Sequence, residues 1–170
     1  GIEEVVIGRD LKNSIFRRNI VLTKVVFGNK IKNIPYEAFY GCSNLSSVDL
    51  SNVESIGNGA FASTKLENVE IPAQLSYLGT SVFSDCTSLT RVSIKANITS
   101  IPNGCFQGCS SLSSVEYPAS VTVIGESAFS GCGFTSFKLN GNVTEIQREA
   151  FSSCKNLENI YGMNNVDSIG

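Results

Sequence analysis

Apolar residues recur along this chain with a period of 22 or 23 residues. The most regular position is a phenylalanine that follows a small residue, as in Ala38-Phe39 and Ala60-Phe61. Successive phenylalanines of this column are 23, 22, 22, 23, 23 and 22 residues apart, and they are Phe16, Phe39, Phe61, Phe83, Phe106, Phe129 and Phe151. A fixed period of this length across the whole chain is typical of a repeat protein.

Each repeat also predicts its own local structure. Segments such as 66–71 and 89–94 read Leu-x-x-Val-x-Ile, and their alternation of apolar and polar residues predicts a short strand with one buried face. A Val-x-x-Ile segment, such as 121–124, predicts a bend and a second short extended stretch. A glycine or proline then precedes the Ala-Phe pair, which predicts a short helical turn. We expect the glycines two residues after the phenylalanine to end this turn with positive φ, namely Gly41, Gly108 and Gly131.

A single coil of this size cannot bury its apolar edge, so the coils must stack on one another. The sequence therefore predicts an α/β solenoid, a right-handed leucine-rich-repeat coil. In it a parallel β-sheet forms the concave face, and short helical turns and extended stretches form the convex side. We expect residues 1–170 to form a single domain of about seven repeats. The first repeat is shortened and the last stops at Gly170 before its Ala-Phe pair. This favours a piece of a longer chain.

Composition excludes several function classes. The 170 residues include no histidine, which excludes Ser-His-Asp and Cys-His catalysis and every His-ligated metal site. The net charge is −2 with interspersed acids and bases, which argues against nucleic-acid binding. No apolar run approaches the roughly 18–20 residues that cross a bilayer, so we expect no membrane insertion. No signal peptide is visible at the start of the sequence.

The six cysteines are best interpreted as core residues. Five of them stand three residues after a repeat phenylalanine, where Thr64 takes the same place in one repeat, and they are Cys42, Cys86, Cys109, Cys132 and Cys154. Cysteine in such a column serves as a small buried apolar residue. Neighbouring rungs could be close enough for a disulfide, but parallel side chains suit its geometry poorly. We therefore expect free buried thiols. Cys105 and Cys109 form a C-x-x-x-C without a second ligand pair, so we expect no metal site.

The outward-facing strand positions are the candidate binding surface, because solenoids most often bind partners through the face of their sheet. Asp49 and Glu70 are expected on adjacent rungs, about 5 Å apart. Paired carboxylates can catalyse glycoside hydrolysis, but two solvated acids on a flat surface are the favoured interpretation. The candidate partner-binding residues are Ser47, Asp49, Asn68, Glu70, Arg91, Ser93, Glu116, Lys138 and Tyr161.

The motif Ile-Gly/Pro-x-x-Ala-Phe-x-Gly-Cys-x-x-Leu-x-x-Val-x-Ile resembles the BspA-like class of leucine-rich repeats. Its clearest copies are residues 34–50, 101–118 and 124–139. Gly162, Phe134 and Phe137 depart from the pattern within single repeats. The resemblance implies a cell-surface or secreted protein of bacteria or parasitic protists that adheres to host matrix proteins, host cells or other microbes. The family defines no fixed binding residues.

Two functions follow from this resemblance. The leading hypothesis is a non-catalytic surface module that recognises a protein or glycan through the concave face, without a cofactor. The alternative is a structural spacer that presents another domain and binds nothing itself. An enzyme is the least favoured class, because no catalytic group accompanies the two carboxylates.

Overall fold

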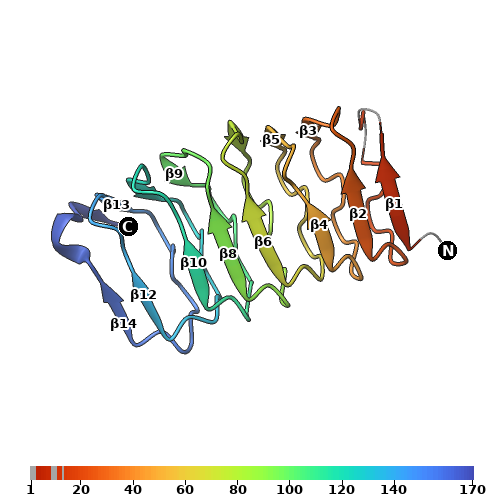
Figure 1. The fold of residues 1–170 in the computed structure, drawn as a ribbon. Helices are drawn as coiled ribbons and strands as arrows, with labels where there is room; N and C mark the ends of the chain where they lie inside the picture. Colours follow the sequence, from red (N-terminus) through yellow and green to blue (C-terminus); the bar gives the residue numbers. More distant parts are fainter. Residues whose placement is uncertain (1–2, 9–10, 13) are drawn as a thin grey trace.

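The computed structural model describes residues 3–8, 11–12 and 14–170, which form one stack of coils (Figure 1). Each coil contributes one strand to a row that we call the main sheet. All pairings in this row are parallel and in register, as in Val25 opposite Val48 and Val69 opposite Val92. The strands are β1 (Glu4–Ile7), β2 (Lys24–Phe27), β4 (Ser47–Asp49), β6 (Asn68–Ile71), β8 (Arg91–Ile94), β10 (Ser114–Glu116), β12 (Ser136–Lys138) and β14 (Asn159–Tyr161).

A second row of two-residue strands runs beside the main sheet, one strand per coil, and we call it the second sheet. Its strands are β3 (Asn33–Ile34), β5 (Ser55–Ile56), β7 (Tyr77–Leu78), β9 (Ser100–Ile101), β11 (Val123–Ile124), β13 (Glu145–Ile146) and β15 (Ser168–Ile169). These pairs are also parallel, with an isoleucine or leucine of each coil over that of the next within each paired group, as in Ile124 and Ile146. The prediction of a parallel-strand solenoid of about seven coils is confirmed.

The main sheet is broken at two joints between coils. Its strands pair as β1-β2-β4, β6-β8-β10 and β12-β14, and Figure 1 shows the wider gaps after β4 and after β10. At both gaps the return segment, which runs from the repeat phenylalanine to the next main strand, is one residue short. Val69 stands eight positions after Phe61, and Phe137 eight positions after Phe129, whereas the corresponding offset in the other return segments is nine.

The two short return segments also make the same unusual hydrogen bond. Lys65 donates its backbone N–H to the carbonyl oxygen of Leu45 at 2.9 Å, and Gly133 donates to that of Leu112 at 3.0 Å. In each case the shortened segment bonds to the preceding coil before the next main strand begins. That strand, β6 or β12, then does not pair with the strand of the preceding coil. The loss of one residue is therefore the physical reason for both gaps.

The second sheet is broken once, between β7 and β9. After β5, β7, β11, β13 and β15 the next residue donates its N–H to the preceding coil, as Gly79 does to Ile56 O and Gly125 to Ile101 O, both at 2.9 Å. Pro102 occupies this position after β9 and has no N–H to donate. The ladder therefore stops where a proline enters it.

The segment around each repeat phenylalanine is a series of tight turns, so the predicted helical turn is wrong. Within the described residues the one helical element is a single 3-10 turn at Met163–Asn165, away from these segments. A helix requires negative φ throughout, but the residues two before and two after the phenylalanine have φ between 48° and 74°. These left-handed pairs are Glu37 and Gly41, Gly59 and Ser63, Ser81 and Asp85, Gly104 and Gly108, Ser127 and Gly131, and Glu149 and Ser153.

The left-handed residues turn alternate N–H groups of this segment toward the next coil. The N–H of Phe39 donates to Ala60 O at 2.8 Å, whereas the N–H of Cys42 bonds back to Phe39 O at 3.1 Å. The positive φ predicted for Gly41, Gly108 and Gly131 is thus confirmed, but these glycines belong to a third ladder between coils and do not end helices.

The core is a set of parallel columns, and the phenylalanine column is its centre. Neighbouring rings from Phe16 to Phe151 are stacked at centroid distances of 5.3–5.8 Å. The five central rings are fully buried, namely Phe39, Phe61, Phe83, Phe106 and Phe129. Each coil therefore depends on its neighbours to remove its aromatic ring from water.

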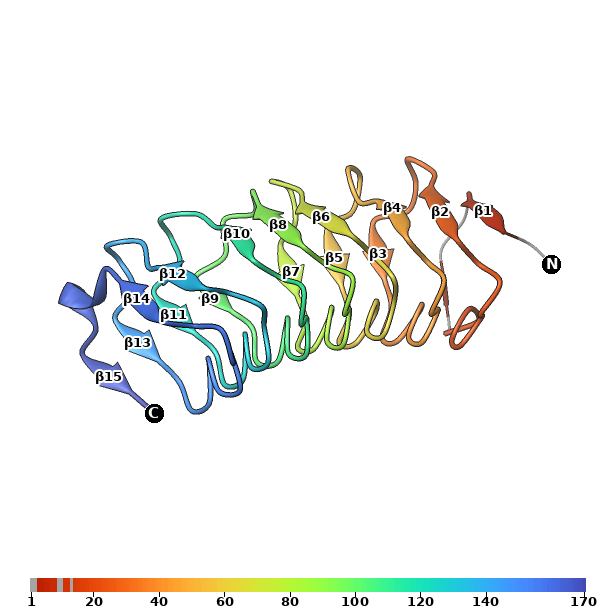
Figure 2. The ribbon, with the colours of Figure 1, turned by 90° about the horizontal axis from the view of Figure 1, so that it is seen from below.

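The stack bends gently, and in Figure 2 the main sheet lies along the outer side of the bend. The sequence led us to expect this sheet on the concave face, and that expectation is wrong. The main sheet opens at two joints, whereas the phenylalanine rings keep a spacing of 5.3–5.8 Å throughout. The side that opens becomes the longer side of the stack.

Candidate functional site

The nine predicted binding residues all lie on the outward face of the main sheet. Eight are exposed and Ser93 is half-buried. The column before the buried strand residue holds Ser47, Asn68 and Arg91. The column after it holds Asp49, Glu70, Ser93, Glu116, Lys138 and Tyr161.

The two gaps divide these residues into three groups. Ser47 and Asp49 lie on β4, before the first gap, whereas Lys138 and Tyr161 are register partners on β12 and β14, after the second. Asp49 and Glu70 lie on successive coils, as expected, but β4 and β6 do not pair, so the two residues are not register partners. The register partner of Glu70 is Ser93.

The remaining five residues lie together on β6, β8 and β10, and we call this group the central patch. Arg91 Nη2 lies 2.6 Å from Glu116 Oε1, and Ser93 Oγ lies 3.5 Å from Glu116 Oε2. Beside this pair is a shallow depression of about 190 Å³, with Asn68 and Glu70 on its other side. The floor of the depression is the strand backbone at Val69, whose side chain is buried in the core on the opposite face.

The central patch carries acidic, basic and amide side chains on its exposed face. The Arg91–Glu116 pair is more than half exposed, so it adds little to stability. It places the Arg91 guanidinium beside the Glu116 carboxylate on the sheet. Glu70 forms no ion pair within the described part of the chain. The patch thus offers a carboxylate, a guanidinium and an amide around the depression.

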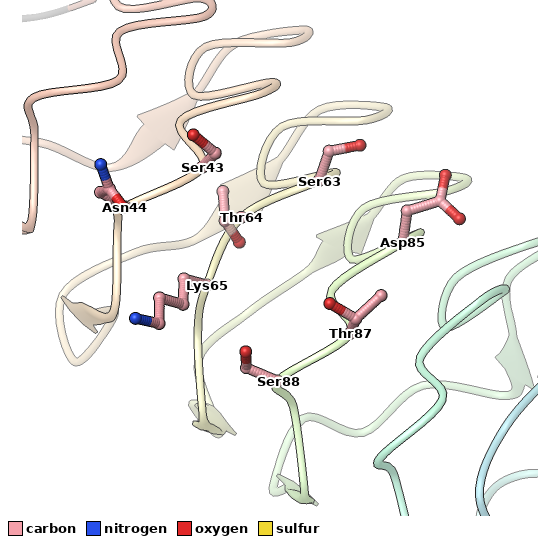
Figure 3. A pocket seen from close by; sticks show the side chains of 8 residues that line it. All are labelled: Ser43, Asn44, Ser63, Thr64, Lys65, Asp85, Thr87 and Ser88. Atoms are coloured by element: carbon pink, nitrogen blue, oxygen red, sulfur yellow. The ribbon is translucent and has the colours of Figure 1, made fainter.

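The short return segments create two hollows that sequence reasoning missed. After Phe61 the shortened segment lies between two longer ones and leaves a hollow of about 350 Å³ (Figure 3). It is lined by Ser43 and Asn44, then Ser63, Thr64 and Lys65, then Asp85, Thr87 and Ser88. A hollow of about 360 Å³ lies in the same way at Cys132 and Gly133, after Phe129. The eight-residue spacing was the signal in the sequence that could have located both.

The cysteines lie against the phenylalanine column and are free thiols, as predicted. Cys109 Sγ donates to Phe83 O at 3.1 Å and Cys132 Sγ to Phe106 O at 3.2 Å, so each thiol bonds to the coil before it. Burial raises the pKa of the Cys86 thiol to about 11 and raises the pKa values of the other five thiols. Protonated thiols are poor nucleophiles and poor metal ligands. These side chains therefore serve packing.

Comparison with known proteins identifies the repeat. A model of the BspA type leucine rich repeat region matches residues 9–132 and 86–170, with six copies of the repeat. The chain belongs to the BspA-type leucine-rich repeat family. No curated protein sequence matches it.

Solved structures of bacterial leucine-rich repeat proteins resemble this BspA-type chain along nearly its whole length. A leucine rich cell surface protein of Faecalibacterium prausnitzii A2-165 matches with a TM-score of 0.75 and 28% identity, covering 98% of this chain and 44% of that one. A leucine-rich repeat protein of Bacteroides ovatus matches with a TM-score of 0.74 and 26% identity, covering 97% and 48%. The leucine-rich repeat protein of T. pallidum matches with a TM-score of 0.67 and 25% identity, covering 95% and 63%.

The chain spans less than half the length of the first two of these proteins. BspA-type repeats of this kind form scaffolds for protein interaction and are typically non-catalytic. Within the described residues, no group of three histidine, cysteine or acidic side chains is placed to bind a metal ion. None of the helical segments in that part of the chain is long and apolar enough to span a bilayer.

Proposed function

We propose that this chain is a non-catalytic recognition module of a cell-surface or secreted protein, and that it mediates adhesion by binding a protein or glycan through the main sheet. The observation that carries the proposal is the central patch. There Asn68, Glu70 and Arg91 surround a shallow depression on the exposed, polar face of the main sheet. A matching structure is a cell surface protein in Faecalibacterium prausnitzii, which supports the location.

The chemistry of the face determines the kind of binding expected. Charged side chains of both signs alternate along it, with Glu4–Lys24 and Arg91–Glu116 already paired. A partner would be bound by many weak contacts spread over several strands. Few charges would lose their water on binding. We expect an affinity of roughly micromolar order and moderate weakening by salt.

The test is attachment of the protein to extracellular matrix proteins and to an array of host glycans. The triple variant Asn68→Ala, Glu70→Ala, Arg91→Ala should lose attachment and keep its stability, since exposed substitutions change it by less than about 0.5 kcal/mol each. The matched control is Gln107→Ala, Glu158→Ala, Lys95→Ala. It removes one amide, one acid and one base at exposed positions outside the binding columns.

Two outcomes would change the assignment. Equal attachment of the triple variant and the parent would move the recognition surface away from the central patch. If the unmutated protein binds no matrix protein or glycan above background, the adhesin is replaced by the alternative, a structural spacer that presents another domain.

A further inference from the structure

The gap between β7 and β9 opens a hollow in the second sheet, on a different side of each coil from the central patch. Its volume is about 240 Å³. All of the side chains that line it are uncharged, and those that matter here are Tyr77, Asn97, Ile98, Thr99, Ser100 and Pro102. A site without charge suits a neutral ligand.

The hollow begins with an irregular corner of the chain. In the other coils with corners ending at Ile31, Val53, Leu75, Val121 and Val143, the corner closes with a bond across three residues, as from Leu75 N–H to Pro72 O, and its last residue is buried. Here Ile98 N–H bonds instead to Ala96 O at 2.9 Å. Ala96 is buried in the core position that the last corner residue would otherwise fill, and that residue, Ile98, is half-exposed.

The walls of the hollow carry backbone groups that other joints use for pairing. At the next joint the N–H groups of Thr122 and Val123 both donate to Thr99 O. In the described chain, the equivalent N–H groups of Thr99 and Ser100 have no backbone acceptor on the β7 coil. Pro102 has no N–H for the carbonyl oxygen of Leu78. At this joint of the described chain, two donors and two acceptors, the carbonyl oxygens of Ser76 and Leu78, are therefore left without a backbone partner beside a hollow large enough to admit a ligand.

Tyr77 supplies an aromatic wall in a fixed position. Its hydroxyl lies 3.3 Å from Asn58 Oδ1, which also accepts the N–H of Thr80 at 3.0 Å. The ring is nevertheless 54% exposed. It therefore offers an open, electron-rich face, with its orientation held by the amide of the preceding coil.

We propose that this hollow binds a neutral pyranose residue of a glycan. One face of such a sugar presents C–H groups, which carry partial positive charge and pack on the ring of Tyr77. Its hydroxyl oxygens accept the N–H groups of Thr99 and Ser100, and one hydroxyl donates to Leu78 O. A concave site with an apolar wall and a few positioned polar groups is the usual form of a small-ligand site. This site is independent of the proposed function of the main sheet.

The test follows backbone amide resonances while methyl pyranosides of glucose, galactose, mannose and N-acetylglucosamine are added at millimolar concentration. At least one sugar should shift the amides of Thr99 and Ser100. Tyr77→Ala should weaken that binding about tenfold or more, which corresponds to about 1.4 kcal/mol. Tyr77→Phe should retain it, because the aromatic face remains.

Tyr36→Ala is the matched control, since Tyr36 is also exposed but lies outside the hollow. It should bind as the parent does, and so should the triple variant of the central patch. The amide spectrum of each variant reports whether it is folded. The proposal is overturned if no sugar shifts Thr99 and Ser100, if the shifts fall on the main sheet, or if Tyr77→Ala binds as tightly as the parent.

Discussion

The two sides of the stack are held together to different degrees. On the turn side, three backbone hydrogen bonds cross every joint from the Phe39 coil to the Phe151 coil without interruption. The phenylalanine rings beside these turns stack across the same joints. On the strand side, the main sheet is interrupted twice and the second sheet once. None of the three interruptions coincides with a loss of turn-side bonds.

This contrast indicates which part of the repeat is structurally essential. The turn side tolerates no change in length, because its left-handed residues and its rings must keep register with the next coil. On the strand side, a missing residue or a proline is tolerated, and the pairing between two neighbouring strands is lost at that joint. Candidate binding features follow the same division, since the central patch is bounded by the gaps and the sugar-sized hollow occupies one.

The largest effect should follow from damage to the ring column. Phe106→Ala removes a fully buried ring that stacks on Phe83 and Phe129. We expect a loss of about 3–5 kcal/mol of unfolding free energy in urea. Phe16→Ala is the control, because Phe16 is half-buried and stacks on one neighbour, Phe39. It should cost less, and equal losses at both sites would contradict the idea that coils depend on neighbours from both directions.

The buried thiols on the turn side should make the protein sensitive to alkaline pH. Burial raises the pKa of Cys86 from 9.0 to about 11. A group whose pKa is raised by folding stabilises the native state fully below its unfolded pKa and ceases to do so as pH rises through its folded pKa. Stability should therefore be constant up to about pH 9 and fall between pH 9 and 11, with roughly 3 kcal/mol from Cys86 alone.

Unfolding in urea with a reductant, repeated across this pH range, measures the effect. Cys86→Ala should show a shallower fall than the parent, although its stability at pH 7 is lower. Parallel curves for the two proteins would show that the thiol stays accessible to solvent in the folded state.

The left-handed turn residues allow a gain in stability to be predicted. Ser127 has a φ of 53°, in a position where the Phe61 and Phe106 turns have Gly59 and Gly104. A side chain in this region costs about 1–2 kcal/mol, which glycine avoids. Glycine also has a more flexible unfolded state, so Ser127→Gly should gain about 1 kcal/mol or less in a thermal melt. Ser130→Gly, at a neighbouring position outside the left-handed pairs, should not stabilise the protein.

How much of this could be predicted from the sequence depends on which side of the coil is considered. The phenylalanine spacing predicted the stacked rings, and the alternating strand residues predicted the outward columns. The turns were predicted as helices because left-handed φ is signalled only by glycine. At Glu37, Ser81 and Glu149 the structure imposes it on residues that disfavour it.

The gaps left signals in the sequence that were not used. The spacing from Phe61 to Val69 is one residue short, and Pro102 stands where glycine donates a ladder bond. Each is a small departure inside a strong repeat, and the regular residues around it dominate the pattern. The central patch was predicted residue by residue, but its limits were not, because they are set by those departures.

The smallest expected effect tests the cause of the gaps directly. Insertion of one serine between Thr64 and Lys65 restores a nine-residue return segment, as after Phe39. We expect β6 to pair with β4 and the hollow of Figure 3 to be filled, with a gain in stability of about 1 kcal/mol at most. The clear readout is hydrogen exchange, because the amide of Glu67 should become protected when it gains a partner in the β4 coil. The control is the same insertion between Cys109 and Ser110, where the segment is already full and the extra residue should bulge without new protection. If Glu67 exchanges at the parent rate after the first insertion, segment length does not open the main sheet, and the bond from Lys65 to Leu45 would be its cause and not its consequence.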